Sequence, residues 1–534
     1  MGATNCKLVF LLLAILPSLS AISWASTNSY TEEISTQCGY TRYPNLCVQT
    51  LTGLGSKNLQ NNDFLYALVN KTISQTGLPR SNFAQLSTHF ISLEAQQART
   101  AIDDCQELTE MALRRLNQAK EAIQRSPEKY KEDIQTWLSA ALTFLQTCKD
   151  TVEDHVLSNV ALSEIYKKMD YLSELCSNPL ALANRITRNP RDGVPTTSRR
   201  LLGDENFPSW LSKRDRRLLE SAETIKADAV VAKDGSGDFD TISDAIQSAN
   251  GGRYVIYVKS GEYNEKISTS KDGITLIGDG KFSTIIYASS SVGKGSSLRG
   301  SSTFSITGDG FIARDIGFQN SAGASAGQAI ALTIASDRSV LYRCSLVGNQ
   351  DTLYALSLRQ FYRECDIYGT VDFIFGNAAA VFQSCSLYFQ RPRIGGAYDV
   401  ILANGRSDPG QNTGFSLQNC KITGGSGFSS SHEAYLGRPW KEYSRAVVMQ
   451  SNIDGVIQSR GWVEWPGYGS SVYKTLYFAE YDNAGAGADT SGRVKWPGFS
   501  VIGTSEASKF TVANLIGGNS WLPSTGVSFV SGLQ

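Results

Sequence analysis

Two aspartates occupy matching places in neighbouring stretches of this chain. Asp351 lies seven residues after Cys344, and Asp372 lies seven residues after Cys365. If these stretches are successive turns of one repeating structure, the two carboxyl groups lie about 5 Å apart, the spacing of neighbouring strands. Two negative charges at that distance repel, so such a pair tends to hold one proton and to act as one acid and one anion. The competing interpretation is that both aspartates only shape turns.

Amide and guanidinium groups accompany this pair. Gln350 directly precedes the first aspartate, and Gln328 stands about one repeat earlier. Amide side chains beside a carboxylate can form an oxyanion hole, which stabilises negative charge on a reacting oxygen. Arg438 and Trp440 add a cation and a flat ring, and an arginine beside Asp372 would keep that carboxyl ionised and oriented. The set favours chemistry that is run by carboxylates.

Other kinds of catalytic machinery are absent from the sequence. Of the three histidines, only His432 is in the second half, and nothing marks it as the base of a Ser-His-Asp triad. No cysteine pair has zinc-ligand spacing, and no phosphate-binding loop or acidic calcium loop occurs. Lys+Arg 50 balances Asp+Glu 50, which is not the positive charge of a nucleic-acid binder. We therefore predict no metal, no cofactor and no nucleic-acid partner.

The element that would bring the aspartates together is a repeat of about 20 residues. Four similar segments end in cysteine, and the first three cysteines are 21 and 20 residues apart. Short strands at this period indicate a parallel β-helix, with one coil per repeat; a propeller or a sandwich is the alternative fold. Equivalent positions on neighbouring coils lie about 4.8 Å apart. That spacing predicts a disulfide between Cys365 and Cys385, with Cys344–Cys365 as the competing pair.

The first part of the chain has a different periodicity. Between residues 91 and 123, and again from 134 to 152, apolar side chains recur every three or four positions, as on the buried faces of helices. Several such helices with short connections indicate an up-and-down bundle over residues 30–180.

Residues 181–221 have the composition of an exposed linker. Two tetrads in it each carry two arginines followed by two leucines, and we predict that the chain is cut at one of them. The tetrads consist of Arg199, Arg200, Leu201 and Leu202, and of Arg216, Arg217, Leu218 and Leu219.

The N-terminus has the features of a secretory signal. Lys7 precedes an apolar run over 8–16, and Ser23-Trp24-Ala25 is an acceptable cleavage site. We predict a signal peptide over 1–25, with an uncleaved anchor as the alternative. Secretion favours disulfides, and the nine cysteines left after cleavage imply at least one free thiol. Asn70 opens the sequon Asn-Lys-Thr and is a predicted glycosylation site.

Five motifs of the second half resemble those of plant-type pectin methylesterases. They are GEYNE at 261–265, QAIAL at 328–332, GNQDTLY at 348–354, GTVDFIFG at 369–376 and LGRPW at 436–440. The helical part resembles the pectin methylesterase inhibitor family in its segments 104–108 and 137–143 and in the cysteine pairs Cys38/Cys47 and Cys105/Cys148, which the resemblance implies are disulfides.

The resemblance implies a four-helix bundle over 30–180, followed by a right-handed parallel β-helix over 222–534. It also implies that the chain removes methyl esters from homogalacturonan and releases methanol and pectate, without metal or cofactor. Asp372 would attack the ester carbonyl, and Asp351 would protonate methanol and then activate water. The remaining roles would fall to Gln328 and Gln350 at the oxyanion, to Arg438 beside the nucleophile, and to Trp440 and Tyr354 along the sugar groove.

The resemblance further implies secretion to the cell wall (the apoplast) and cutting of the linker by a subtilisin-like protease. The mature enzyme would be a monomer whose partners are its own pro-domain or separate inhibitor proteins. Whether the helical domain silences the esterase, or only assists folding or retention, stays open at this point.

Two positions depart from the family pattern. Asn349 stands where an aromatic residue is usual, and Leu298 stands where a threonine is typical. Both departures predict altered substrate contacts. They also motivate the alternative of a non-catalytic pectin-binding wall protein, and a β-helix lyase or glycosidase is a third hypothesis.

Overall fold

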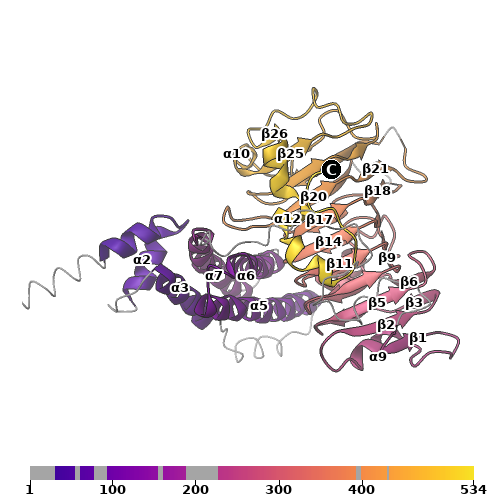
Figure 1. Cartoon of the computed structure of the whole chain (residues 1–534), viewed down its shortest axis with the longest axis horizontal. Coiled ribbons are helices and arrows are strands. Elements are labelled where there is room, and N and C mark those ends of the chain that lie inside the picture. The colour runs from indigo at the N-terminus through magenta and orange to yellow at the C-terminus, as the bar shows by residue number, and fades with distance from the viewer. Residues whose placement is uncertain are drawn as a thin grey trace, which may run out of the picture. The chain divides into compact units, whose positions relative to one another are not determined.

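The computed structural model describes residues 31–53, 61–76, 93–153, 160–187, 226–391, 398–429 and 432–534. These residues form two compact units, one helical and one rich in strands (Figure 1). The predicted signal peptide and both arginine–leucine tetrads lie outside the described residues. Among the helices within the described ranges, none has the length and apolar character needed to cross a membrane.

The N-terminal region is helical, as its periodicity predicts. Its helices are α2 (Pro44–Thr52), α3 (Asn61–Thr76), α5 (Leu93–Arg125), α6 (Lys131–Glu153) and α7 (Val160–Asn184). Leu138, Ala141 and Leu145 of α6 are fully buried, which confirms the apolar face expected there. The disulfides Cys38–Cys47 and Cys105–Cys148 are both formed, and the second joins α5 to α6.

The predicted glycosylation site lies within a helix. Asn70 is exposed on α3, but Thr72 of the same sequon is buried and its hydroxyl donates to the Leu68 carbonyl at 2.8 Å. Glycosylation of Asn70 stays a prediction.

The second unit is a parallel β-helix, which confirms the fold indicated by the repeat. Each strand pair described in it is parallel, and most coils give one strand to each of three sheets. Sheet A contains β1 (Ala229–Val231), β2 (Tyr254–Val258), β5 (Ile274–Gly278), β8 (Ile312–Arg314), β11 (Ser339–Tyr342), β14 (Arg359–Arg363), β17 (Ala379–Gln383), β20 (Gly414–Gln418), β23 (Arg445–Met449), β25 (Tyr477–Tyr481) and β26 (Phe499–Val501).

Sheets B and C complete the coils. Sheet B contains β3 (Gly261–Asn264), β6 (Thr284–Ala288), β9 (Gly317–Asn320), β12 (Ser345–Val347), β15 (Asp366–Gly369), β18 (Ser386–Phe389), β21 (Lys421–Gly424) and β24 (Asn452–Ile453). Sheet C contains β4 (Ile267–Thr269), β7 (Phe304–Ile306), β10 (Leu332–Ile334), β13 (Leu353–Ala355), β16 (Ile374–Gly376), β19 (Asp399–Asn404) and β22 (Ala434–Pro439).

Short helices flank this stack: α9 (Ile242–Gln247), α10 (Val472–Thr475), α11 (Thr504–Ala507) and α12 (Val512–Leu515). Val512 of α12 joins Val340, Phe361 and Val381 of sheet A in one apolar cluster. The C-terminal segment therefore covers part of the outer face of sheet A (Figure 1).

The turn from sheet A to sheet B repeats with the same backbone conformation on successive coils. One residue in each turn has a φ between 50° and 55°: Asp315, Arg343, Glu364, Ser384, Asn419, Gln450 and Asp482. This left-handed conformation is uncommon for residues other than glycine. Directly after four of these residues come Cys344, Cys365, Cys385 and Cys420, all of them buried. The cysteine repeat seen in the sequence is therefore the signature of this turn.

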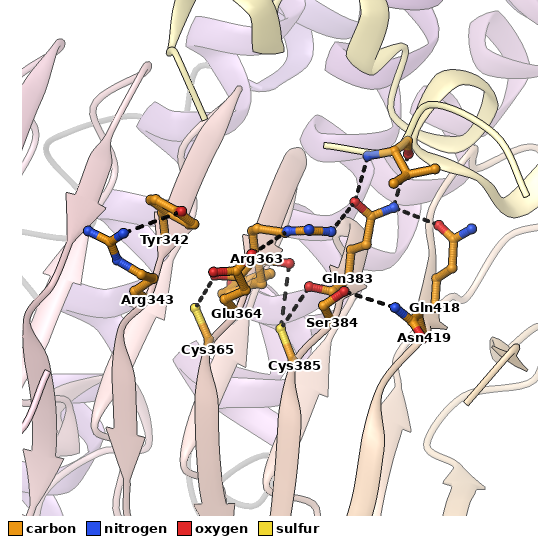
Figure 2. Close-up of polar contacts among 12 residues, drawn as sticks. Tyr342, Arg343, Arg363, Glu364, Cys365, Gln383, Ser384, Cys385, Gln418 and Asn419 are labelled. Carbon is orange, nitrogen blue, oxygen red and sulfur yellow. Dashed lines mark hydrogen bonds and ion pairs between the residues drawn. The ribbon is translucent and has the colours of Figure 1, made fainter. Parts of the chain in front are cut away.

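The predicted disulfide between Cys365 and Cys385 is wrong in this structure, and so is the competing Cys344–Cys365 pair, because all three residues are free thiols. The physical reason is the register, since β14 and β17 are parallel and Arg363 pairs with Gln383. Side chains at equivalent positions then point the same way, and the thiols of Cys344, Cys365 and Cys385 hydrogen-bond their neighbours without reaching the short distance that a disulfide needs. Each sulfur instead donates to main-chain carbonyls, Cys365 to Leu341 and Cys385 to Tyr362, both at 3.5 Å. Figure 2 shows the two side chains in the turns directly before the adjacent strands β15 and β18.

A column of glutamines on these coils holds the C-terminal segment. Gln383 Nε2 donates to Gln418 Oε1 at 2.9 Å (Figure 2), and Gln418 Nε2 donates to Gln450 Oε1 at 3.2 Å. The same amides bond main-chain groups of alternate residues in the segment, namely Val530, Gly532 and Gln534. The column thus presents donors and acceptors as the edge of a sheet would.

A buried ion pair anchors the last coils. Arg493 Nε and Nη2 donate to Glu480 at 2.7 and 3.1 Å, and both side chains are 1% exposed. Trp462 Nε1 donates to the same carboxylate at 3.1 Å. The indole lies against Gly437, where a Cβ would come within 2.9 Å of the ring, so a larger residue cannot replace this glycine without movement. The network therefore supports the strand that carries Arg438.

We expect Glu480→Gln to lower the free energy of unfolding by about 3–5 kcal/mol, because it leaves the Arg493 guanidinium buried without a counter-charge. Urea unfolding of the full chain measures this change. Glu506→Gln is the matched control: it breaks an ion pair with Lys509 whose side chains are 37% and 64% exposed, and we expect a loss under about 1 kcal/mol. Equal losses in the two variants would contradict the prediction.

Candidate active site

The two aspartates singled out by the sequence lie at the same turn of adjacent coils, between sheets B and C. Asp351 precedes β13 and Asp372 precedes β16, and the Asp351 amide donates to the Val371 carbonyl at 3.0 Å. Both aspartates are 4% exposed, and both have left-handed backbones, with φ of 63° and 52°. Such conformations cost energy in residues other than glycine and are concentrated at functional sites. The predicted juxtaposition of the two coils is therefore confirmed.

Arg438 reaches Asp372 from β22. Its Nε donates to Oδ1 at 2.8 Å and its Nη2 donates to Oδ2 at 2.5 Å, so the guanidinium and the carboxylate meet as two forks. The side chains are only 11% and 6% exposed. Ala403 of the intervening strand β19 pairs with Arg438 on one side and with Phe375 on the other. The ion pair between Arg438 and Asp372 therefore places a fixed positive charge beside one of the two aspartates.

The two carboxyl groups have different electrostatic surroundings. Burial, followed by repulsion from Asp372, raises the pKa of Asp351 well above its usual 3.8, against the weaker effects of Arg438 and Gln328. Burial also raises the pKa of Asp372, but Arg438 opposes this rise through its charge and its hydrogen bonds. Asp372 is therefore the first of the two to ionise, and Asp351 keeps the shared proton. The geometry supplies one anion and one acid.

The two predicted amides stand beside this pair. The side chain of Gln328 hydrogen-bonds Asp351, and the carbonyl of Gln350 accepts the Ala329 amide at 3.1 Å. Both glutamines are partly exposed, unlike the aspartates. The Gln328 amide, hydrogen-bonded to Asp351, suits the stabilisation of an oxyanion, and Gln350 directly precedes that aspartate in the chain.

Aromatic rings continue from this site in a row. Phe375 stacks on Tyr354 at 4.2 Å between ring centroids, and lies 6.0 Å from Trp440, which in turn lies 6.5 Å from Trp465. Gly405 leaves room for the indole of Trp440, since a Cβ at position 405 would come within 2.7 Å of that ring. Flat apolar rings of this kind suit the faces of sugar rings, and the half-buried Trp440 and Trp465 offer such surfaces.

The structure modifies one expectation and adds two residues. Tyr354, expected to line the groove, is 1% exposed, since Phe375 of the next coil stacks against its face. Phe375 and Trp465 were not singled out from the sequence. Phe375 pairs with Tyr354 and lies 21 residues after it, so the repeat that relates Asp351 to Asp372 is a signal that could have found it. Trp465 lies in a connection without periodicity. Its ring centroid lies 4.2 Å from the Arg438 guanidinium, and no sequence pattern predicts this contact.

The two departures from the family pattern lie in turns. Asn349 is partly exposed, and its carbonyl accepts the Thr370 amide at 3.0 Å. Leu298 precedes the short 3₁₀ turn Arg299–Ser301 and is also partly exposed. Their effect on substrate contacts stays a prediction.

His432 faces another carboxyl group. Its Nε2 lies 3.5 Å from Asp399 Oδ1, and Asp399 is 1% exposed. Burial raises the pKa of Asp399 to about 7 and lowers that of His432. Within the described ranges, no cluster of His, Cys, Asp and Glu side chains has the arrangement of a metal site.

We expect Asp399→Asn to stabilise the protein at pH 8 but not at pH 4. Between about pH 4 and 7 the carboxyl of Asp399 keeps its proton in the folded protein but has lost it in the unfolded chain. The contribution of the protonated carboxyl to stability is therefore full below pH 4 and is lost as pH rises through 7. The change amounts to as much as about 4 kcal/mol. Urea unfolding at the two pH values measures it, with the exposed Asp240→Asn as control. A gain independent of pH would refute this origin.

Comparison with known proteins places this geometry among related chains. Residues 228–519 match the family model described as pectinesterase, and residues 32–182 match the model described as plant invertase/pectin methylesterase inhibitor. The probable pectinesterase/pectinesterase inhibitor 54 of Arabidopsis thaliana is 45% identical over 96% of both chains, and pectinesterase 2 of Citrus sinensis is 42% identical over 98% of this chain and 99% of its own.

A solved structure supports the same relation. The pectin methylesterase from carrot is 49% identical and superposes with a TM-score of 0.56, over 59% of this chain and 100% of the carrot chain. The matched share, 59% of this chain, is close in length to residues 222–534, so we expect that part of the chain to fold by itself.

Proposed function

This chain belongs to the pectinesterase family and carries an inhibitor-like domain ahead of its esterase domain, and from that premise we propose which residues carry out the reaction. Asp372 is the nucleophile and Asp351 is the acid and base. The observation that carries this assignment is that Arg438 donates two hydrogen bonds to the carboxylate of Asp372. This contact makes Asp372 the anion of the buried carboxyl pair.

In the first step, an oxygen of Asp372 attacks the carbonyl carbon of the methyl ester. The bond to the methoxyl oxygen breaks, and that oxygen takes the proton of Asp351 and leaves as methanol. The galacturonyl group stays joined to Asp372 as a mixed anhydride. The amides of Gln328 and Gln350 stabilise the negative charge that develops on the carbonyl oxygen.

In the second step, water attacks the same carbonyl carbon and gives a proton to Asp351, which is now the base. The bond to Asp372 breaks and restores its carboxylate beside Arg438. The galacturonic acid group then ionises, so the sum is one ester and one water converted to a carboxylate, a proton and methanol. Trp440, with Phe375 and Tyr354 behind it, supports the sugar rings of the homogalacturonan.

The two family matches support the proposed domain organisation. They end and begin at residues 182 and 228, so the connection between them holds both arginine–leucine tetrads. The esterase is released from the helical pro-domain by a subtilisin-like protease that cuts at one of these tetrads, and acts as a monomer in the cell wall. The signal-like segment over 1–25 and the two disulfides of the helical region support export.

Methanol release from highly methylated pectin tests this proposal. Residues 222–534 should release methanol in proportion to enzyme and time, without shortening the polymer and without unsaturated products. Addition of the separate helical domain should lower that rate if the domain is inhibitory. A folded β-helix that binds pectin but releases no methanol would overturn the assignment and favour a binding protein.

A further inference from the structure

We propose that Tyr398 is a positioning residue that holds Arg438 in place while Asp372 is covalently occupied. This inference rests on the two-step reaction proposed above. It concerns a residue that neither the sequence motifs nor the aspartate pair single out.

The guanidinium of Arg438 is held on three sides. Nε and Nη2 donate to Asp372, whereas Nη1 points elsewhere and donates to the Tyr398 hydroxyl at 3.2 Å. Trp465 covers the guanidinium, with 4.2 Å between the Cζ and the ring centroid. The contact to Asp372 is ionic, but the contacts to Tyr398 and Trp465 are not.

Tyr398 is itself well anchored. It directly precedes β19, and its ring meets that of Tyr435 edge to face at 5.6 Å. Tyr435 belongs to an apolar cluster with Val400 and Val463, against which Tyr398 packs. A phenol held by a rigid ring contact is a suitable fixed acceptor, since it has few conformations to lose.

The importance of this acceptor changes during the reaction. When the galacturonyl group is attached, Asp372 is no longer an anion and one of its oxygens is part of the anhydride. The forked ion pair then loses its charge and one of its two acceptors. The hydroxyl of Tyr398 and the ring of Trp465 are unchanged by the reaction, so they keep Arg438 ready to receive the carboxylate that water releases. The hydroxyl therefore serves the second step more than the first.

Tyr398→Phe tests this role, because it removes the hydroxyl and keeps the ring. The hydrogen bond is of the size that corresponds to about a five-fold change in rate. We expect kcat for methanol release by residues 222–534 to fall about five-fold, while kcat/KM, which reports the first step, changes less than two-fold. Rapid mixing should reveal a burst of methanol of up to one equivalent per enzyme, followed by the slower steady rate.

The control variant is Tyr435→Phe. It removes a hydroxyl that donates to Glu433 at 2.9 Å, in the same cluster but away from Arg438. We expect wild-type kcat and no added burst. A variant that merely unfolds in part would lower kcat, kcat/KM and burst together, and thermal unfolding of both variants monitors this.

The outcomes separate the two proposals. Loss of kcat with preserved kcat/KM and a burst supports the role of Tyr398. Parallel loss of kcat and kcat/KM, or unchanged kinetics, overturns it while leaving the esterase assignment intact. Absence of methanol from the wild-type protein, or its persistence in Asp372→Asn, overturns the proposed function itself.

Discussion

Replacing Asp372 with asparagine should reduce methanol release roughly 10⁴-fold or more, the range seen when a covalent nucleophile is removed. Asparagine has the shape of aspartate but no charge, so it cannot attack the ester carbonyl. It also leaves the Arg438 guanidinium, 11% exposed, without its anion. The measurement is steady-state methanol release from highly methylated pectin by residues 222–534.

Asp366→Asn is the matched control for this variant. Asp366 begins β15 of the same coil, at the opposite end of that strand from the turn that carries Asp372, and forms an ion pair with Lys281 at 2.8 Å. We expect it to keep its activity within about two-fold, because it removes an ion pair with Lys281, which has no role in the proposed reaction. If Asp372→Asn kept a tenth of the wild-type rate while folded, another group would be the nucleophile.

The same assignment predicts a bell-shaped dependence of the rate on pH. As pH falls, Asp372 takes up a proton and the nucleophile is lost; as pH rises through the elevated pKa of Asp351, the acid is lost. The two limbs belong to the coupled pair, whose charged neighbours in this site are each other and Arg438.

The adjacency of the candidate catalytic pair could be predicted from the sequence because a coil period turns equal offsets into neighbouring positions. Asp351 and Asp372 have the same offset from the cysteines of the A-to-B turn, and the strands between keep register over every coil that carries the site. The same repeat located Gln328 and Gln350. The chemistry of these residues is thus encoded in a periodic signal.

The remainder of the site has no such signal. Tyr398 and Trp465 come from connections of irregular length, so their distance to Arg438 cannot be counted along a repeat. The error over Cys365 and Cys385 has a related cause, since the repeat gives the distance between two positions but not the direction of their side chains. Parallel strands keep those directions alike, which suits stacked rings such as Tyr354 and Phe375 and disfavours a disulfide.

Replacing Asp351 with asparagine should lower methanol release about 10²–10⁴-fold, the usual contribution of a positioned acid or base. Both steps suffer, because methoxide must leave unprotonated and water must attack without a base. The asparagine cannot titrate, so the alkaline limb of the pH profile should disappear. Since the repulsion that Asp351 imposes on its neighbour is removed as well, loss of activity cannot be assigned to a failure of Asp372 to ionise.

A change of substrate separates the acid from the nucleophile. The substrate is a galacturonate ester of a more acidic alcohol, such as trifluoroethanol, whose alkoxide can leave without a proton. The first step should therefore recover in Asp351→Asn and release a burst of alcohol. The second step still lacks its base, so the steady rate should stay low. Asp372→Asn should show neither effect, because a better leaving group does not replace an absent nucleophile. Equal recovery in both variants, or in neither, would mean that the two carboxyl groups do not divide the work as proposed.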